Sequence, residues 1–174
     1  MLNLNKYNQK GITIMALVVT VIVILIIAGI SINEGKSLIK KSKIENLMTN
    51  MIVIKSKSKV IAEEINAATW NKTEEEKKAK FTDENTYAMQ ETTISQEQAN
   101  QLDSTIKDAE YTCYLVTKDT LEYMNLSEID DEDNFIVVYK KGDFTKLDIV
   151  YKEAIPYDGE NFYTLSSLQA KMEE

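Results

Sequence analysis

The sequence contains no histidine and no arginine, and it has one cysteine and one proline among 174 residues. Without histidine, the chain lacks the side chain that most often acts as a general base or binds a transition metal. Without arginine, it lacks the planar group that binds phosphate and guanine through paired hydrogen bonds. The 20 basic residues are all lysines, and 28 acidic residues give a formal charge of −8. Because nucleic-acid binding depends on neutralising phosphates, we expect no nucleic-acid partner.

The single cysteine, Cys113, excludes a disulfide within the chain. Its neighbours are apolar and aromatic, so we expect a small buried residue in a strand. The sequence also lacks a glycine-rich phosphate loop and a nucleophile constellation. Paired carboxylates can be drawn almost anywhere in so acidic a chain, so they indicate no catalytic pair. We therefore expect neither an enzyme nor a cofactor.

A long uncharged run lies near the N-terminus, between Gly11 and Asn33. Fifteen of the 21 residues from Ile12 to Ile32 are Ile, Val, Leu or Met, which makes the run almost uniformly apolar. As a helix it would be about 30 Å long, the thickness of the hydrocarbon core of a bilayer. Alternation with polar residues is missing, which argues against a half-buried strand. The run predicts a transmembrane helix over residues 12–33, with membrane lipid as its partner.

Not every kind of apolar segment fits this run equally well. A cleaved secretory signal has an apolar region of about 7–15 residues, and Ala28-Gly29-Ile30 is a poor cleavage site. A buried core helix rarely stays apolar on every face. A plain single-pass anchor of a binding or sensor protein, with an extracytoplasmic α+β domain, fits the hydropathy well. Composition alone leaves that alternative open.

Lysines flank the run on both sides. Two precede it and four follow it closely: Lys6 and Lys10, then Lys36, Lys40, Lys41 and Lys43. Positive charge near a membrane span favours the cytoplasmic side. The lysine count therefore slightly favours a cytoplasmic C-terminal part.

The junction between the polar N-terminus and the apolar run has a distinctive sequence. Lys10-Gly11 is followed by Ile12 and Thr13, and then by Ile14, Met15, Ala16, Leu17, Val18 and Val19. This junction resembles the prepilin cleavage and methylation segment of type IV pilins and pseudopilins. The resemblance implies a leader over residues 1–11, cleavage after Gly11 by a prepilin peptidase, and methylation of Ile12. Because that peptidase acts at the cytoplasmic face, it also implies an extracytoplasmic C-terminal head, opposite to the lysine count.

The same resemblance implies a pilin-like fold. It also implies assembly through the apolar helix, with other pilin-like subunits, into a pilus or pseudopilus for secretion, adhesion or DNA uptake. Two positions depart from the family pattern: Ile12 stands where most pilins have Phe, and Ala16 where most have Glu. In the family that Glu pairs with the free N-terminus of a neighbour. Its absence implies that packing alone sets the register, or that the chain is a minor or initiating subunit. The variant is similar to pilin-like proteins of Gram-positive bacteria.

Apolar residues beyond the run recur at helical spacing. They are Ile44, Leu47, Met48, Met51, Ile52, Ile61, Ile65 and Ala68. This pattern predicts an amphipathic helix over residues 34–70 that continues the membrane segment and ends near Trp70. A juxtamembrane coiled segment or a helix on the lipid surface is the alternative.

Residues 71–174 predict a small α+β head. A charged stretch from Thr73, acidic first and basic last, predicts a short solvated helix or a linker. A capping box at Ser95 and Gln98 predicts a helix to about Lys107. A second, brief helix is expected over residues 120–126. Strands are expected over 110–117, 134–139, 146–151 and 161–165, with turns at 140–143 and 156–159 and a short C-terminal helix. The pattern therefore predicts an antiparallel sheet.

The densest acidic patch, residues 128–133, is the one candidate metal site that the sequence offers. Asp130, Asp131 and Asp133 could supply oxygen ligands to calcium. Their spacing differs from that of an EF-hand, and no glycine provides the tight turn. A solvated acidic loop is the simpler interpretation. The strand aromatics Tyr111, Tyr114, Tyr139, Tyr151 and Phe162 are expected to pack in the core rather than to bind a ligand.

Overall fold

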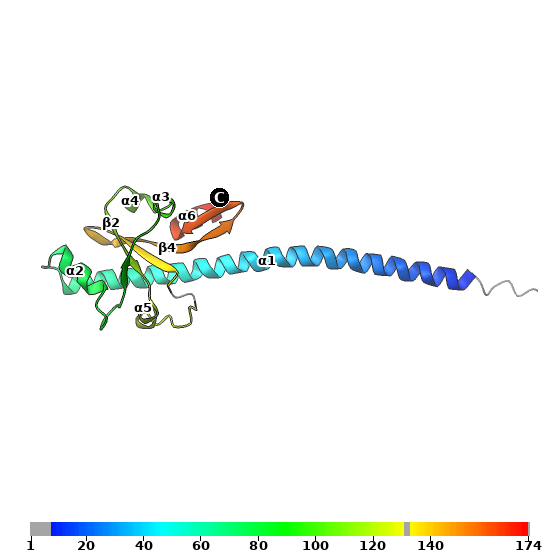
Figure 1. Ribbon diagram of the computed structural model, residues 1–174, viewed down its shortest axis with the longest axis horizontal. Helices are drawn as coiled ribbons and strands as arrows, with labels where there is room; N and C mark the ends of the chain where they lie inside the picture. The colour runs from blue at the N-terminus through cyan, green and yellow to red at the C-terminus, as the bar shows by residue number, and fades with distance from the viewer. Residues whose placement is uncertain (1–7, 131–132, 174) are drawn as a thin grey trace, which may run out of the picture. The chain divides into compact units, whose positions relative to one another are not determined.

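The computed structural model describes the backbone of residues 8–130 and 133–173, and within them the side chains of residues 20–21, 39–130 and 133–173. The chain forms two units, Met1–Lys43 and Ile44–Glu174. The second unit, which we call the head, contains most of the secondary structure (Figure 1).

Helix α1 is assigned from Asn8 to Ala68, close to the expected end near Trp70. The predicted transmembrane segment 12–33 falls within it, but apart from Thr20 and Val21 the side chains of that segment lie outside the described residues. In the described part of the chain, no helix combines the length and the hydropathy needed to cross a bilayer.

Five strands form one antiparallel sheet in the head, in the order β1-β2-β3-β4-β5. Their bounds are Gln90–Thr92, Tyr111–Leu115, Phe135–Lys140, Asp143–Tyr157 and Glu160–Thr164. Each strand pairs with its neighbours in the sequence, so every pairing is local. The expected α+β class with a long N-terminal helix and an antiparallel sheet is confirmed. The short strand β1 is additional to the strands that the sequence predicts.

Two tight turns define the register of the last three strands. The β3–β4 turn places Gly142 at φ +79°, and the β4–β5 turn places Asp158 and Gly159 at +50° and +82°. Positive φ is costly for most residues, and Gly and Asp are among those that tolerate it. Pro156 and Tyr157, expected in the second turn, instead pair with Asn161 and Glu160 as part of the strands. Strand β4 is therefore longer than expected.

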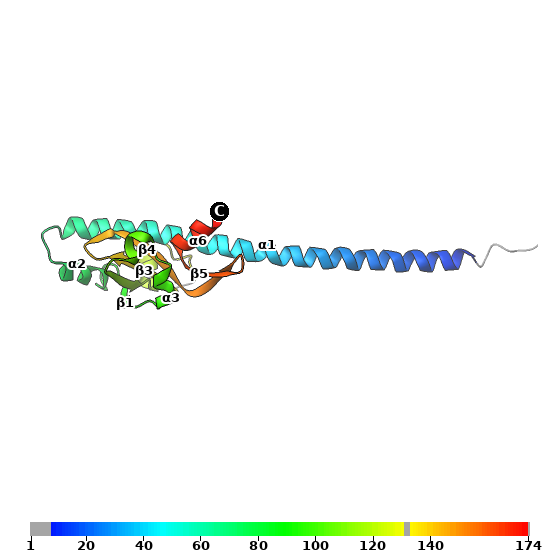
Figure 2. The ribbon, with the colours of Figure 1, turned by 90° about the horizontal axis from the view of Figure 1, so that it is seen from above.

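One face of the sheet packs against α1 and forms the main core of the head (Figure 2). From α1 this core takes Met51, Ile54, Ile61 and Ile65, all at most 2% exposed, and we call these four residues the inner stripe. From the sheet it takes Tyr114, Val137, Tyr139 and Ile149, which alternate with residues of the other face. The hydroxyl of Tyr139 donates a hydrogen bond to the carbonyl oxygen of Ser58 at 3.1 Å. This bond helps to set the position of α1 along the sheet.

Helix α2, Glu74–Phe81, begins at a capping box formed by Thr73 and Glu76. Its last residue, Phe81, is fully buried and lies against the rings of Tyr114 and Tyr139, with centroid distances of 4.9 and 4.7 Å. The expectation of a merely solvated helix or linker is therefore wrong at this end. The residues before Phe81 are mostly charged, so the sequence pattern does not indicate that this one aromatic side chain anchors the segment.

The other face of the sheet is covered by two short helices, α3, Gln96–Asn100, and α4, Ser104–Lys107. The capping box of Ser95 and Gln98 is confirmed. The single helix expected to Lys107 is wrong, because the side chain of Asp103 caps a new helix by accepting from the N–H of Thr105 at 2.8 Å. Leu102 and Ile106 close a second, smaller core over Cys113, Val138 and Val150, among others.

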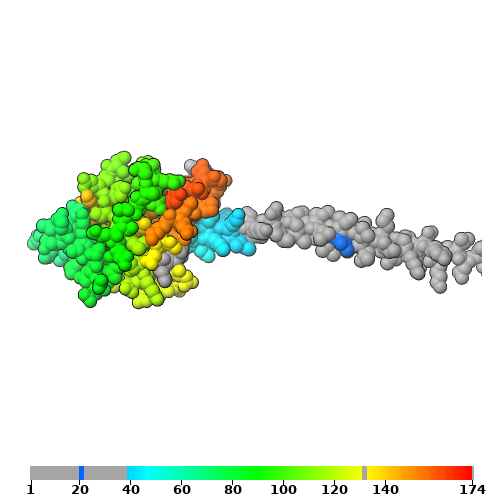
Figure 3. Space-filling view, viewed as in Figure 1, coloured from blue at the N-terminus to red at the C-terminus, as the bar shows by residue number. Residues whose placement is uncertain are grey.

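Two more helices lie in the described part of the head. Helix α5 runs from Lys118 to Tyr123 and α6 from Leu165 to Met172, so both expected helices are confirmed with shifted bounds. In Figure 3 the visible surface of the head is mostly green to red, so segments after α1 build it. Among the strand aromatics, Tyr114, Tyr139 and Phe162 are buried as expected, whereas Tyr111 and Tyr151 are half-buried.

Replacing Phe81 by alanine tests whether α2 is anchored by this ring. We expect Phe81→Ala to lower the free energy of unfolding of the head by about 3–5 kcal/mol, because it leaves a cavity among aromatic rings. Thermal unfolding of the full chain in detergent micelles, followed by circular dichroism, measures this. Glu75→Gln, at an exposed position of the same helix, is the control and should change stability by less than about 0.5 kcal/mol. Equal effects of the two changes would contradict the packing.

Candidate assembly surface

The side of α1 opposite the sheet carries an uncharged exposed strip. Thr49, Ile52, Ser56 and Val60 follow one another at three- and four-residue spacing, and we call them the outer lane. Ile52 is 37% exposed and Val60 is 49% exposed. Residues three and four apart are neighbours on a helix surface, so these four side chains form one continuous strip.

The hydroxyl groups of the outer lane are satisfied within α1 itself. Thr49 donates to the carbonyl oxygen of Glu45 at 2.8 Å, and Ser56 donates to that of Ile52 at 3.0 Å. A hydroxyl that bonds back to its own helix needs no partner from solvent. The lane therefore offers small, mostly apolar groups to a neighbour, and another helix could pack closely on it. Exposed Lys59 and Glu63 limit the lane toward the end of α1.

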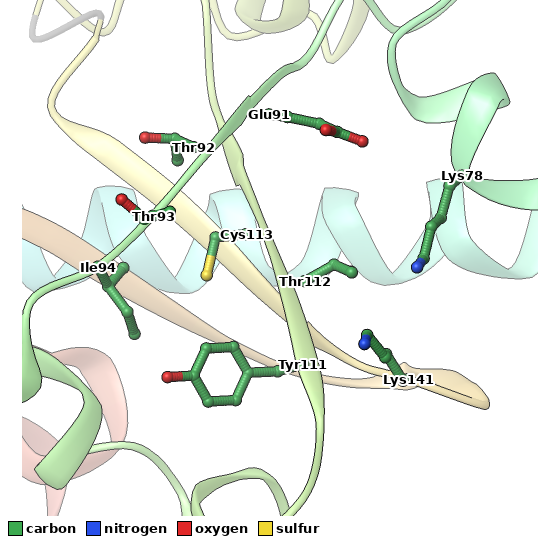
Figure 4. Close-up of a pocket in the computed structure, with 9 residues that line it drawn as sticks. All are labelled: Lys78, Glu91, Thr92, Thr93, Ile94, Tyr111, Thr112, Cys113 and Lys141. Carbon is green, nitrogen blue, oxygen red and sulfur yellow. The ribbon is translucent and has the colours of Figure 1, made fainter. Parts of the chain in front are cut away.

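An open cavity lies beside the edge strand β1, with a volume of about 480 Å³ (Figure 4). Lys78 and Lys141 border one end of it, and Cys113 and Tyr111 lie across from strand β1. Lys141 is paired with Glu110 at 2.9 Å. Burial raises the pKa of the Cys113 thiol to about 12, so the thiol is protonated at neutral pH and is a poor nucleophile. The cavity therefore does not bring together a nucleophile and a base.

A buried carboxylate, Asp148, joins three parts of the head. Its Oδ2 accepts hydrogen bonds from the hydroxyl of Ser166 on α6 and, at 3.2 Å, from the N–H of Asp103 before α4. Lys55 Nζ of α1 lies 3.8 Å from its Oδ1. The side chain of Asp148 is fully buried, and this burial raises its pKa, while the hydrogen bond from Ser166 and the charge of Lys55 oppose the rise. Asp148 is thus an internal connection rather than a site open to ligands.

The residues that the sequence singled out for processing and membrane insertion belong to the first part of α1. The backbone of residues 10–19 is helical within α1. The side chains of those residues, from Lys10 to Val19, lie outside the described part of the chain. The cleavage site at Gly11 and the apolar assembly helix therefore stay predictions.

The calcium candidate is only partly covered by the structure. Asp131 lies outside the described residues, and Asp130 and Asp133 are exposed. Asp133 has a φ of +65°, a turn conformation that Asp tolerates. Among the side chains that the structure describes, those of residues 20–21, 39–130 and 133–173, no cluster of three or more acidic or cysteine groups is arranged to hold a metal ion.

Comparison with protein-family models, curated proteins and solved structures finds no match to this chain. The candidate surface therefore rests on the geometry of α1 and on the sequence pattern. Sequence reasoning found the amphipathic character of residues 44–68, but it placed Ile52 with the core residues. The back-bonding of Thr49 and Ser56 has no clear signal in the sequence, because the same residues also occur in ordinary solvated helices.

Burial of the Asp148 carboxyl makes the free energy of unfolding of the head depend on pH. The pKa of Asp148 is raised in the folded state above its ordinary value of 3.8. At a pH between these two pKa values, the carboxyl is protonated in the native chain and ionised in the unfolded chain. The free energy of unfolding therefore falls as pH rises through that window. We expect the wild type to lose stability relative to Asp148→Asn as pH rises above 3.8, measured by thermal unfolding in micelles.

Asp143→Asn is the matched control with the opposite sign. Hydrogen bonds from Thr145 lower the pKa of Asp143. Its contribution to stability is present above its ordinary pKa and is lost as pH falls through the lowered value. The difference between wild type and Asp143→Asn should therefore grow only as pH rises toward 3.8, the ordinary pKa of the group, and stay constant above it, where the Asp148 effect sets in. A pH-independent difference for Asp148→Asn would show that its carboxyl is not buried as described.

Proposed function

We propose that this protein is a type IV pilin-like structural subunit rather than an enzyme. The observation that carries the proposal is the Lys10-Gly11-Ile12-Thr13 junction before a uniformly apolar run, which resembles a prepilin processing segment. The architecture of the chain supports it: an α+β head is packed on the last part of a helix that begins at Asn8. In this proposal residues 12–33 are the membrane-spanning part of that helix.

The outer lane gives the proposal a second support. A subunit that assembles through α1 needs a side of the helix that the head does not occupy. The inner stripe holds the head, and the outer lane stays exposed and uncharged. Polar groups buried without partners oppose association, and those of Thr49 and Ser56 already have partners. The lane can therefore be buried against other pilin-like subunits at little polar cost.

The proposal includes a life cycle with two locations. The precursor sits in the cytoplasmic membrane with its head outside, and a prepilin peptidase removes residues 1–11. The helix then leaves the lipid and packs among other subunits. Exposed Lys40, Lys41 and Lys43 follow the span on the exported side, against the usual charge bias. Protease treatment of intact protoplasts tests this orientation, and a head that is protected there would contradict it.

The intact mass of the protein separates this proposal from a plain membrane anchor. In cells with a prepilin peptidase, we expect the mature chain to have lost residues 1–11 and to carry one added methyl group at Ile12. Without the peptidase, or in a Gly11→Leu variant, the full mass should persist. Lys6→Gln is the control within the leader and should be processed. An N-terminus that remains at Met1 in cells that process other prepilins would contradict the proposal.

A charge placed in the outer lane tests whether this surface takes part in assembly. Ile52→Lys places a charge in the lane and should weaken incorporation into assemblies by at least about tenfold, because a lysine buried without a partner is costly. Incorporation is measured as the fraction of the chain that co-sediments with assembled subunits. Ala170→Lys, at an exposed position of α6, is the control. If both variants are incorporated like the wild type, the lane does not take part in assembly.

A further inference from the structure

The only tryptophan of the chain, Trp70, is the most exposed large apolar side chain described, at 79%. It lies in the turn between α1 and α2. Tryptophan is enriched at the energetic centres of protein interfaces, where it fills pockets on the partner. A single exposed apolar residue is common on protein surfaces, so the exposure of Trp70 needs further observations before it carries meaning.

The turn that carries Trp70 is held at both ends. Thr69 is buried, and its N–H and its hydroxyl both donate to the carbonyl oxygen of Ile65, the former at 2.9 Å. The N–H of Lys72 donates to the carbonyl oxygen of Thr69 at 2.9 Å. The capping box of Thr73 and Glu76 then fixes the start of α2. The indole is thus presented from an ordered backbone, which reduces the entropy lost when it binds.

A cavity of suitable character lies elsewhere on the head, between α1 and the end of α5. It has a volume of about 220 Å³. Val60, Ile61, Tyr123 and Met124 form its apolar lining, and Lys57, Glu64 and Asn125 form its polar lining. Val60 and Tyr123 are 49% and 43% exposed, so both are available to a partner. An apolar side chain that entered here would bury surface on both sides.

The edge of this cavity also offers a hydrogen-bond acceptor. Glu64, which lines it, accepts hydrogen bonds through Oε2 from the hydroxyls of Tyr87 at 3.1 Å and Tyr123 at 3.2 Å. An ionised carboxylate has about four acceptor positions, so these two bonds leave capacity for another donor. The indole N–H is a donor only. The cavity therefore matches both parts of a tryptophan side chain, its apolar rings and its single donor.

We propose that Trp70 of one copy of this chain inserts into the cavity lined by Val60, Tyr123 and Met124 of another copy. The partner is a second copy because every chain carries both the exposed indole and the cavity. The two features occupy different positions on the head, so the contact is heterologous. Heterologous contacts repeat from copy to copy and build rings or filaments. This inference rests on the proposed function and gives it a specific contact.

The single tryptophan makes the contact directly observable. The full chain is purified in mild detergent, and association is followed by sedimentation over a concentration series. Emission of Trp70 and its quenching by acrylamide are recorded on the same samples. We expect the emission to move to shorter wavelength and the quenching to fall as copies associate. Tyr123→Asp, which changes the cavity but leaves the outer lane intact, should raise the midpoint concentration of association at least about tenfold and keep Trp70 accessible.

Controls and outcomes separate this contact from assembly in general. Ala170→Asp adds the same charge at an exposed position of α6 and should behave like the wild type. Association with Trp70 as accessible as in the monomer would overturn this inference and leave the proposed function standing. Absence of association at any concentration would also overturn this inference, whereas the proposed function is decided separately by processing after Gly11. Circular dichroism of Tyr123→Asp must match that of the wild type. Tyr123→Phe keeps the ring that lines the cavity and should associate like the wild type.

Discussion

Burial of the inner stripe of α1 against one face of the sheet is the interaction on which the rest of the head depends. An antiparallel sheet that is apolar on one face must bury that face against another element, and here the helix supplies the cover. Burying each large aliphatic side chain of the stripe contributes about 1.5–3 kcal/mol, so its four residues contribute about 6–12 kcal/mol. That sum is an upper bound, but it is as large as the whole net stability of a typical domain, about 5–15 kcal/mol. Loss of the stripe would therefore unfold the head rather than loosen it.

The same packing decides which surfaces remain for partners. Since the sheet occupies one side of α1, the outer lane stays exposed on the other, and the cavity near Val60 forms where α5 meets the helix. The turn after α1 carries Trp70 away from the core. In the proposed function, one helix thus anchors its own head with one side and meets other subunits with the rest. Asp148 adds a polar connection that ties α1, the start of α4 and α6 together.

Much of this fold could be predicted from the sequence because its signals are local. Helical spacing marked the stripe, and β-branched runs bounded by Gly142 and Gly159 marked the hairpins. The errors came from contacts between distant residues. Phe81 is buried only because Tyr114 and Tyr139 lie beside it. The N–H of Asp103, just before α4, donates to Asp148, which lies 45 positions further along the chain. The cavity needs residues about 60 positions apart, Val60 and Tyr123, and no pattern along the chain indicates that they meet.

Labelling of a cysteine placed in the outer lane tests the central claim most directly. Cys113 is buried, so Ser56→Cys provides the one accessible thiol, and Ser127→Cys in an exposed loop provides the reference. Intact cells are treated with a membrane-impermeant maleimide, with and without the assembly machinery. The account predicts that Cys at position 56 reacts in cells that cannot assemble the protein and is protected in cells that can, while position 127 reacts in both. Equal reactivity of position 56 in the two kinds of cell would contradict it.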